Sequence, residues 1–341
     1  MKILIFTQKL NRNDSTLGFF VDWLQKISSH FEKIYVVCLE KGNFSLPDNI
    51  EVFSLGKEEG MGKLSYVVFF FKYLFDLRGK YDSVFVHMNE EYVVMGGLFW
   101  KVSKIPVFLW RNHPKGSFWT RIAVLFSKKV FCTAKDSFTA RFKKTILMPV
   151  GIDTKLFKED KSISKNKNSV CMIGRISPIK RVEVGLEAVS ILIKNGVQVS
   201  MTVLGPCEEK NLSYLESLKD FVSRNNLNPY VKFFDGVPPS ELPKIYNSHE
   251  ILVNLTESGS FDKTIVEAPA CGVIPLVTNK SLSGLLPEVC LAESDPLKVA
   301  NSIELLLRPD VRVKIEKDLK SFVSENSLDN LVKKLISEIK G

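Results

Sequence analysis

The sequence predicts an α/β protein in which two doubly wound parallel-sheet domains follow each other along the chain. Strand-like and helix-like patterns alternate through most of the 341 residues. At about 150 residues per domain, this length suggests two domains, each with a full core. Hydrophobic residues make up 45% and charged residues 25% of the chain. These values are typical of a soluble globular protein and exclude long disorder and collagen-like repeats.

Apolar runs without polar alternation mark the strands of the first domain. They cover residues 3–7, 34–39, 83–87, 106–110 and 130–133. Such runs are typical of parallel strands that are buried on both faces. Between the first two runs, an apolar stripe at helical spacing predicts an amphipathic helix: Leu17, Phe20, Val21, Leu24 and Ile27. The alternation predicts a right-handed doubly wound sheet.

The same alternation restarts after a polar, charged stretch over residues 158–168, which we interpret as an interdomain linker. The second set of strands is expected at residues 169–173, 199–204, 231–234, 251–255 and 273–278. Helical patterns over 311–323 and 328–339 end the chain. We therefore predict Rossmann-like domains at 1–158 and 159–325, and a C-terminal helix at 326–341 that packs back on the first domain.

No segment predicts a membrane span or a signal peptide. The longest apolar stretch, residues 64–75, is shorter than the roughly 20 residues that a spanning helix needs. The apolar core at the N-terminus has only four residues before Gln8 and Lys9, too few for a signal peptide. The six cysteines lie too far apart for a zinc or redox motif and are expected to be reduced core thiols. We expect a cytoplasmic protein.

Positive charge is concentrated in residues 101–150, where eleven Lys or Arg stand against one acid, Asp136. Eight aromatic residues are interleaved with them: Phe108, Trp110, Phe118, Trp119, Phe126, Phe131, Phe138 and Phe142. Such a surface suits an anionic lipid membrane, to which each nearby cation contributes about 1 kcal/mol. A solvated basic face is the alternative. Only bulk charge supports nucleic acid, so no nucleic-acid partner is expected.

Several common motifs are absent. Residues 56–64 resemble a phosphate-binding P-loop, but the spacing is one residue too long and Leu64 replaces the required Ser or Thr. No G-x-G-x-x-G follows the first strand, and the chain has no G-x-S-x-G and no Asp-x-Asp pair. No metal site is therefore expected, and a bound diphosphate would have to be neutralised by the protein's own cations.

One segment that supplies such cations directly follows the strand at 169–173. Gly174 allows a sharp turn, and Arg175 at the strand's carboxyl end can grip phosphate oxygens with its planar fork. Lys180, expected to begin the next helix, can reach the same oxygens as a point charge. The alternative, two solvated cations in a loop, is less favoured because ligands of α/β sheets bind at the carboxyl ends of strands.

A second segment follows the strand at 251–255. Its small residues Ser258, Gly259 and Ser260 can form an anion-binding nest of amides. Asp262 is the expected N-cap of the next helix, whose start adds partial positive charge. Lys263 and Glu267 are four residues apart and share one helix face. Their spacing predicts a helical salt bridge, or a carboxylate that accepts hydrogen bonds from ribose hydroxyls. Both interactions can occur together.

These residues make the chain similar to GT-B glycosyltransferases of family 4, over nearly its whole length and most strongly over 169–280. The element G-R-(L/I)-x-x-x-K-(G/R) is matched by Gly174, Arg175 and Lys180. The element E-G-F-G-x-x-x-x-E-A-x-A-x-G-x-P-V is matched by Phe261, Glu267, Ala268, Ala270, Gly272 and, one place late, Pro275. The resemblance implies two domains facing each other across a cleft, the first binding the acceptor and the second a nucleotide sugar.

The resemblance also implies residue roles. Arg175 and Lys180 would act on the donor diphosphate and Glu267 on the ribose. The backbone around Gly236 resembles the base-contacting loop, and Gly18 lies where family glycines approach the donor phosphate. The expected donor-binding set is Gly18, Gly174, Gly236, Ser258, Gly259, Ser260, Asp262, Lys263 and Glu267.

Two histidines are candidates on the acceptor side of the reaction. His87 ends the strand at 83–87 and resembles the family histidine that faces the cleft. It would orient the acceptor or polarise its hydroxyl, and a buried core histidine is the alternative. His113, which follows the next strand, is the second choice.

The sequence departs from the family pattern at Gly259, which stands where the family has its first Glu. That acid contacts the transferred sugar in the family, and Glu257 or Asp262 could replace it. The departure keeps two alternatives open, a non-catalytic sugar-nucleotide-binding subunit and a GT-B epimerase or phosphorylase.

The favoured activity is that of a retaining, metal-independent glycosyltransferase. It would move a hexosyl or related residue from a nucleoside-diphosphate sugar to a hydroxyl of a glycan or lipid-linked acceptor, without a cofactor. We expect it in the cytoplasm, with peripheral attachment to the inner face of the cell membrane through residues 101–150.

Overall fold

The computed structural model describes residues 1–14, 16–257 and 261–341, which form two compact units. Unit 1 comprises Met1–Gly151 and Leu328–Gly341, and unit 2 comprises Ile152–Ser327. The chain thus leaves unit 1 after Gly151 and returns to it at Leu328. The first boundary lies earlier than the expected residue 158. The expected linker 158–168 lies inside unit 2, where the amide of Asp160 donates to Asn247 Oδ1 at 2.7 Å.

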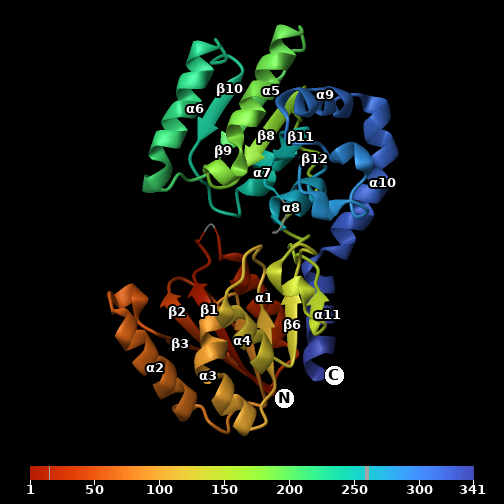
Figure 1. Ribbon diagram of the computed structural model, residues 1–341. Helices are drawn as coiled ribbons and strands as arrows, with labels where there is room; N and C mark the ends of the chain where they lie inside the picture. The colour runs from red at the N-terminus through yellow and green to blue at the C-terminus, as the bar shows by residue number, and fades with distance from the viewer. Residues whose placement is uncertain (15, 258–260) are drawn as a thin grey trace. The chain divides into compact units, whose positions relative to one another are not determined.

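Unit 1 is built on a parallel sheet of seven strands among the described residues (Figure 1). The strands are β1 (Lys2–Leu10), β2 (Lys33–Lys41), β3 (Ile50–Ser54), β4 (Ser83–His87), β5 (Val107–Trp110), β6 (Lys129–Cys132) and β7 (Thr145–Leu147). Their order across the sheet is β3-β2-β1-β4-β5-β6-β7. Register partners include Ile3 with Ile34 in β2 and Ile3 with Ser83 in β4, so β1 and β4 are neighbours although two strands separate them in sequence.

Helices cover both faces of this sheet. They are α1 (Phe19–Ser28), α2 (Lys63–Asp76), α3 (Glu90–Val102), α4 (Phe118–Phe126) and α11 (Leu328–Lys340). Alternate strand residues enter different cores, because successive side chains of a strand point to opposite faces. Ile3 and Ile5 pack with α1 and α11, whereas Leu4 and Phe6 pack with α2, α3 and α4. The C-terminal helix therefore completes one of the two cores of unit 1.

Unit 2 repeats this plan with a parallel sheet in the order β10-β9-β8-β11-β12. Its strands are β8 (Ser169–Ile173), β9 (Ser200–Leu204), β10 (Val231–Phe234), β11 (Ile251–Asn254) and β12 (Ile274–Val277). Its helices are α5 (Val182–Lys194), α6 (Leu212–Arg224), α7 (Leu242–Asn247), α8 (Thr264–Ala270), α9 (Pro296–Leu306) and α10 (Pro309–Glu325). Helix α5 packs on α6 and α9, and α10 packs on α8 and α9.

The predicted α/β class with two parallel sheets is confirmed. The buried strands end within a few residues of their expected positions, since continuous apolar runs identify them. The edge strands β3 and β7 were not expected. In β3, the exposed Glu51 interrupts the apolar residues and none of the five residues is fully buried, and β7 has three residues.

Each sheet has a topological switch point, where chain connections leave two neighbouring strands in opposite directions. In unit 1 it lies between β1 and β4, and in unit 2 between β8 and β11. Ligands of open α/β sheets bind outside the carboxyl ends of the strands at such points. The side chains that follow these four strands are therefore the candidates for a functional site.

Candidate functional site at the switch point of unit 2

The loops after β8 and β11 meet at the switch point of unit 2. Gly174 follows β8 with φ +142, a conformation that side-chain-bearing residues rarely adopt. Lys180 ends a short 3-10 turn, Pro178–Lys180, and α5 begins only at Val182. The expectation that Lys180 begins the next helix is therefore wrong by one short turn. Its side chain returns over Gly174, with Cε 3.6 Å from the position that a Cβ at residue 174 would occupy.

Lys180 is held by residues that follow β11. Its ammonium forms an ion pair with the carboxylate of Asp262 and a 3.1 Å hydrogen bond to Thr256 Oγ1. The same carboxylate accepts hydrogen bonds from Asn254 Nδ2 and from Thr256 Oγ1, both at 3.0 Å. The side chains of Lys180 and Asp262 are only about one-fifth exposed, at 21% and 22%. A connected polar network therefore joins the two loops, and we call these four residues the switch-point cluster.

Asp262 is charged in this network. Burial acts to raise the pKa of its carboxyl, but Lys180 and the hydrogen bonds from Asn254 and Thr256 outweigh burial and lower that pKa. The expected role of Asp262 as helix N-cap is wrong, because α8 begins at Thr264 with Lys263 at the N-cap. The carboxylate of Asp262 pairs with Lys180 instead of capping the helix.

Two arginines lie in the loops around the cluster. Arg175, directly after Gly174, pairs with Glu208 at 2.9 Å, and its side chain is 57% exposed. Arg181 has a left-handed backbone with φ 52 and pairs with Glu257 at 3.4 Å. Exposed pairs of this kind contribute little to stability. Both guanidinium groups can therefore exchange their partners for an anionic ligand at small cost.

Glu267 lies one turn into α8 and is buried. The hydroxyl of Tyr246, itself fully buried, donates to Glu267 Oε2 at 3.0 Å. Burial raises the pKa of the Glu267 carboxyl, although Lys263 and the Tyr246 hydrogen bond act to lower it. Lys263 and Glu267 thus interact electrostatically, as their spacing predicts. Tyr246 was not expected as part of a site, and its position near the end of α7 gave no signal for it.

The backbones after β8, β9 and β10 approach closely beside the cluster. A Cβ at Gly205 would lie 1.9 Å from the carbonyl oxygen of Gly174, so residue 205 must be glycine. A Cβ at Gly236 would lie 2.7 Å from Pro206 Cδ. The structure thus brings Gly174, Lys180, Asp262 and the predicted Gly236 loop to one edge of the sheet. Asn254 and Thr256 join them, and their polar character at the end of β11 is the signal that could have identified them.

The switch point of unit 1 is apolar in comparison. The Nδ1 of His87 lies 3.1 Å from Thr7 Oγ1, and its ring stacks on Phe20 with centroids 4.1 Å apart. Phe19 and Trp23 also contact the ring, and the residue is 1% exposed. This burial supports the core alternative for His87 rather than direct contact with an acceptor.

The other unit 1 candidates lie in loops. His113 is exposed, and its Nδ1 accepts a 3.0 Å hydrogen bond from the amide of Lys115 in its own loop. Gly18 precedes α1, and a Cβ there would lie 2.6 Å from the carbonyl oxygens of Arg12 and Asp14. Gly18 is therefore required by the local backbone, whatever its role toward a ligand.

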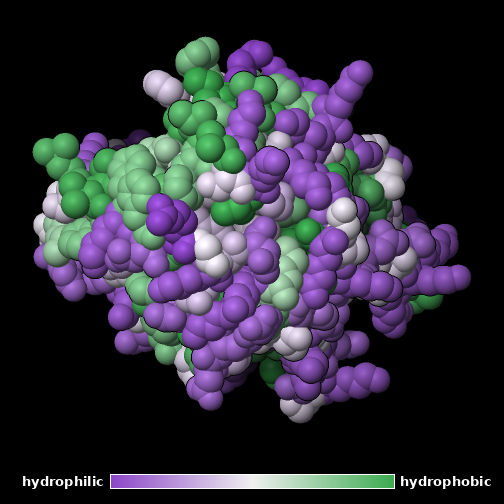
Figure 2. All heavy atoms as spheres, turned by 90° about the horizontal axis from the view of Figure 1, so that it is seen from below, coloured by the Kyte–Doolittle hydropathy of each residue, from purple (hydrophilic) through white to green (hydrophobic). Residues whose placement is uncertain are grey.

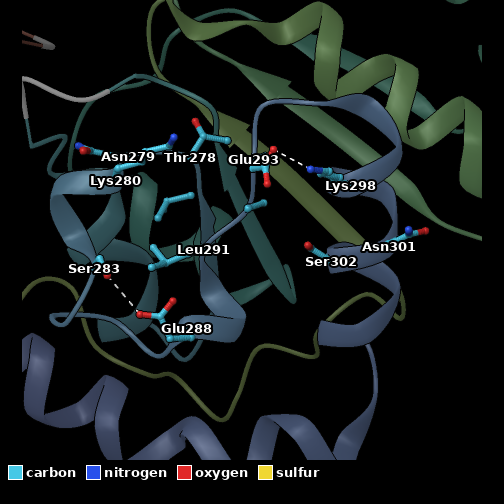
Figure 3. A pocket seen from close by; sticks show the side chains of 12 residues that line it. Thr278, Asn279, Lys280, Ser283, Glu288, Leu291, Glu293, Lys298, Asn301 and Ser302 are labelled. Carbon is cyan, nitrogen blue, oxygen red and sulfur yellow. Dashed lines mark hydrogen bonds and ion pairs between the residues drawn. The ribbon is translucent and has the colours of Figure 1, made fainter.

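One cavity of unit 2 lies away from the predicted residues, beside β12 (Figure 3). It has a volume of about 580 Å³ and lies between the 278–293 segment and α9. Ser283 and Glu288 hydrogen-bond on one wall at 3.2 Å, and Glu293 pairs with Lys298 at 2.6 Å on the other. A smaller cavity of about 20 Å³, room for one water molecule, is lined by residues that include Gly174, Lys180 and Asn254. The smaller cavity is the one that adjoins the switch-point cluster, since Lys180 and Asn254 line it.

Ser258, Gly259 and Ser260 lie outside the described residues. Among the described residues, no three His, Cys, Asp or Glu side chains are grouped as metal ligands would be. No helix in the described part is long and apolar enough to cross a membrane. All six cysteines are free, and five of them are buried.

Fold and cluster together define a doubly wound α/β protein with a charged network at the switch point of its second sheet. Residues 153–293, all within unit 2, match the model of the family described as Glycosyl transferases group 1. This match confirms the predicted resemblance to that group, whereas the assignment to family 4 stays a prediction.

Curated relatives carry the same class of name. D-inositol 3-phosphate glycosyltransferase of Segniliparus rotundus is 24% identical over 185 residues, which are 49% of this chain and 40% of the relative. The protein of the same name from Corynebacterium efficiens is 25% identical over 162 residues, 44% of this chain and 37% of the relative. The chain thus covers about two fifths of the length of these relatives.

Solved structures are similar over the whole chain. Anabaena Alr3699/HepE in complex with UDP gives a TM-score of 0.80 at 19% identity and covers 100% of both chains. Sucrose-phosphate synthase from Thermosynechococcus elongatus gives 0.75 at 13% identity, covering 99% of this chain and 98% of that one. At these identities the likeness concerns the fold alone, and it confirms the predicted GT-B fold class.

Proposed function

We propose that this protein is a glycosyltransferase that moves a sugar from a nucleoside-diphosphate sugar to a hydroxyl of a glycan or lipid-linked acceptor. The observation that carries the proposal is the switch-point cluster, in which Lys180 is fixed beside Gly174 within the segment that matches the glycosyl transferases group 1 model. Structural neighbours in complex with UDP and with UDP-glucose support a nucleotide sugar as the donor.

Cations of the protein then stabilise the leaving group. Departure of a nucleoside diphosphate places negative charge on phosphate oxygens and positive charge on the sugar. One preorganised contact to such a developing charge is often worth about 3–4 kcal/mol. Lys180 supplies a fixed ammonium, and Arg175 supplies an exposed guanidinium that can leave Glu208 for a phosphate. We propose that these two groups make the reaction independent of a metal ion.

The buried carboxylate of Glu267 is proposed to accept hydrogen bonds from the ribose hydroxyls. Tyr246, which donates a hydrogen bond to it, fixes its orientation. Retention of anomeric configuration follows if the leaving phosphate takes the acceptor proton on the same face of the sugar, so that no strong general base is needed.

A thermal-shift screen against nucleoside diphosphates and their sugars tests donor binding, because a bound ligand raises apparent stability. We expect one base to give the largest shift, and expect Lys180→Ala to reduce that shift. Nucleotide release with a panel of acceptors then tests transfer. Activity that persists in a metal chelator and an NMR spectrum showing an unchanged anomeric configuration are the expected results. Binding without release across the panel would instead support the non-catalytic alternative.

We also propose that unit 1 attaches peripherally to an anionic membrane surface. Eight of the cations in residues 101–150 are exposed: Lys101, Lys104, Lys115, Arg121, Lys128, Lys135, Arg141 and Lys143. Large apolar side chains are exposed on neighbouring helices, among them Leu98 and Val102 on α3 and Phe118, Trp119 and Leu125 on α4. Figure 2 shows hydrophobic residues gathered into patches on one face of the molecule. Cations beside exposed apolar groups suit a lipid surface.

Vesicle flotation tests this attachment. Binding to vesicles with anionic lipid is expected to exceed binding to neutral vesicles and to weaken with salt, since screening reduces surface attraction. Lys101→Glu with Lys104→Glu is expected to reduce it strongly, whereas the control Lys194→Glu on α5 leaves it unchanged. Vesicle binding that depends neither on salt nor on lipid charge contradicts the proposal.

A further inference from the structure

Asp262 forms an ion pair with Lys180, the cation that the proposed function assigns to the donor diphosphate. Its carboxylate is anchored independently of that cation, because Asn254 and Thr256 at the end of β11 both donate hydrogen bonds to it at 3.0 Å. An ammonium has three donor positions, and Lys180 directs one to Asp262 and one to Thr256. The ammonium therefore has a fixed position, and it has a fixed negative charge as its neighbour.

A carboxylate in this position affects donor and product differently. Any diphosphate that contacts Lys180 also approaches the negative charge of Asp262. The phosphate and the carboxylate then repel each other, because both are negatively charged. In a sugar nucleotide the terminal phosphate is esterified and carries one charge. After transfer the same phosphate is free, and its second ionisation, with a pKa near about 6, adds further negative charge at neutral pH. The repulsion from Asp262 is therefore greater for the released nucleoside diphosphate than for the donor.

We propose that Asp262 is a resident counter-ion: it positions Lys180 and, by competing for it, weakens binding of the nucleoside diphosphate product more than binding of the donor. This inference rests on the proposed function. It makes Asp262 a positioning and product-release residue that acts through Lys180.

Asp220 provides the matched control, because it is a second aspartate of unit 2 that pairs with a cation. It pairs with Arg224 on α6 at 3.6 Å, and its side chain is 69% exposed. A carboxylate so exposed is screened by water and salt. Its removal tests whether any lost negative charge in unit 2 gives the same effect.

Calorimetric titration of wild type, Asp262→Asn and Asp220→Asn with UDP, GDP and their glucose conjugates tests the inference. We expect Asp262→Asn to bind the preferred nucleoside diphosphate at least about fivefold tighter, through loss of like-charge repulsion. Its affinity for the sugar nucleotide should rise by a smaller factor, and Asp220→Asn should change neither affinity by more than about twofold. In the Lys180→Ala background the extra tightening by Asp262→Asn should disappear.

Several outcomes overturn the inference. It fails if Asp262→Asn binds the nucleoside diphosphate no more tightly than wild type, if donor and product affinities change equally, or if the tightening persists without Lys180. Should Asp262→Asn not fold, Asp262→Ser, which keeps a hydroxyl for Asn254 and Thr256, is judged by the same criteria. A folded wild-type protein that binds neither nucleotides nor their sugars overturns the proposed function itself, whereas normal wild-type binding with an unaltered Asp262→Asn profile overturns only the inference.

Discussion

The two sheets share one plan but differ in what surrounds their switch points. In unit 1, His87 at the end of β4 contacts Thr7 of β1, both residues are buried, and rings of α1 pack against His87. In unit 2, β8 and β11 are followed by Lys180 and Asp262, which remain partly exposed and are joined by hydrogen bonds. A titratable residue at a strand's carboxyl end is thus a functional candidate only where the following loop leaves it accessible. Where an amphipathic helix begins close by, the same position is part of the core.

Substitution of the cations in unit 2 is expected to have the largest effect on activity. Lys180→Ala should lower kcat/KM about a hundredfold, the cost of one preorganised contact to a developing charge. Arg175→Ala should lower it at least about tenfold. Lys194→Ala, an exposed lysine at the end of α5, is the control. Nucleotide release under first-order conditions measures these values, and an unchanged kcat/KM in both variants would refute the role of the cluster.

In unit 1, substitution of His87 is expected to lower stability and to leave activity nearly unchanged. His87→Ala removes a ring packed against Phe20, Phe19 and Trp23 and should lower the free energy of unfolding by about 2–4 kcal/mol, as for other large buried side chains. The kcat of the folded fraction should stay within about threefold of wild type. Denaturant unfolding and steady-state kinetics separate the two readouts. A large loss of kcat at unchanged stability would instead support a role of His87 at the acceptor. Both switch points would then carry residues that act in the reaction.

Tyr246→Phe tests whether the Tyr246 hydroxyl supports Glu267 in its proposed role at the ribose. The substitution removes the hydroxyl that donates to Glu267 and leaves a buried carboxylate with one partner fewer. We expect a loss of about 1–2 kcal/mol of stability and a raised KM for the nucleotide. The preference for ribose over 2′-deoxyribose nucleotides should fall as well. If stability falls but that preference does not, Tyr246 is a packing residue only.

The smallest expected effect is on the pH dependence of stability. Burial raises the folded-state pKa of Glu267 above 4.5, so the folded protein binds this proton more tightly than the unfolded chain. The contribution of Glu267 to stability should therefore decrease as pH rises from 4.5 through its folded-state pKa. Glu267→Gln does not titrate, so the difference in unfolding free energy between wild type and this variant should change in that direction. A difference that is constant with pH, or that rises, contradicts the assignment.

Much of the fold could be predicted because buried strands carry a strong local signal. The runs at 83–87 and 169–173 coincide with β4 and β8. The edge strands β3 and β7 of unit 1 gave a weaker signal, since they are not continuously buried. The boundary of unit 1 was harder still, because residues 158–168 are polar yet hydrogen-bond within unit 2.

The site was predictable only where spacing encodes it. Gly174 and Lys180 belong to one short segment, so their proximity could be inferred from the sequence. The pairing of Lys180 with Asp262 joins residues far apart in the chain, and it depends on β8 and β11 being neighbours. The same holds for Tyr246 and Glu267. The role of His87 could not be decided from position, because only the packing of α1 shows that the ring is covered.

The return of the chain to unit 1 has a consequence for biosynthesis. Leu331 and Leu335 of α11 lie in the same core as Ile3 and Ile5 of β1, and Leu331 packs against Gly151. A ribosome makes β1 to β7 first, then all of residues 152–327, and only afterwards the helix that closes that core. Nascent domains fold in the order in which they emerge, so unit 2 is able to reach its final form while unit 1 still waits for its last helix. Of the two units, the one that is begun first is finished last, and a stop codon before residue 328 would leave unit 1 without α11.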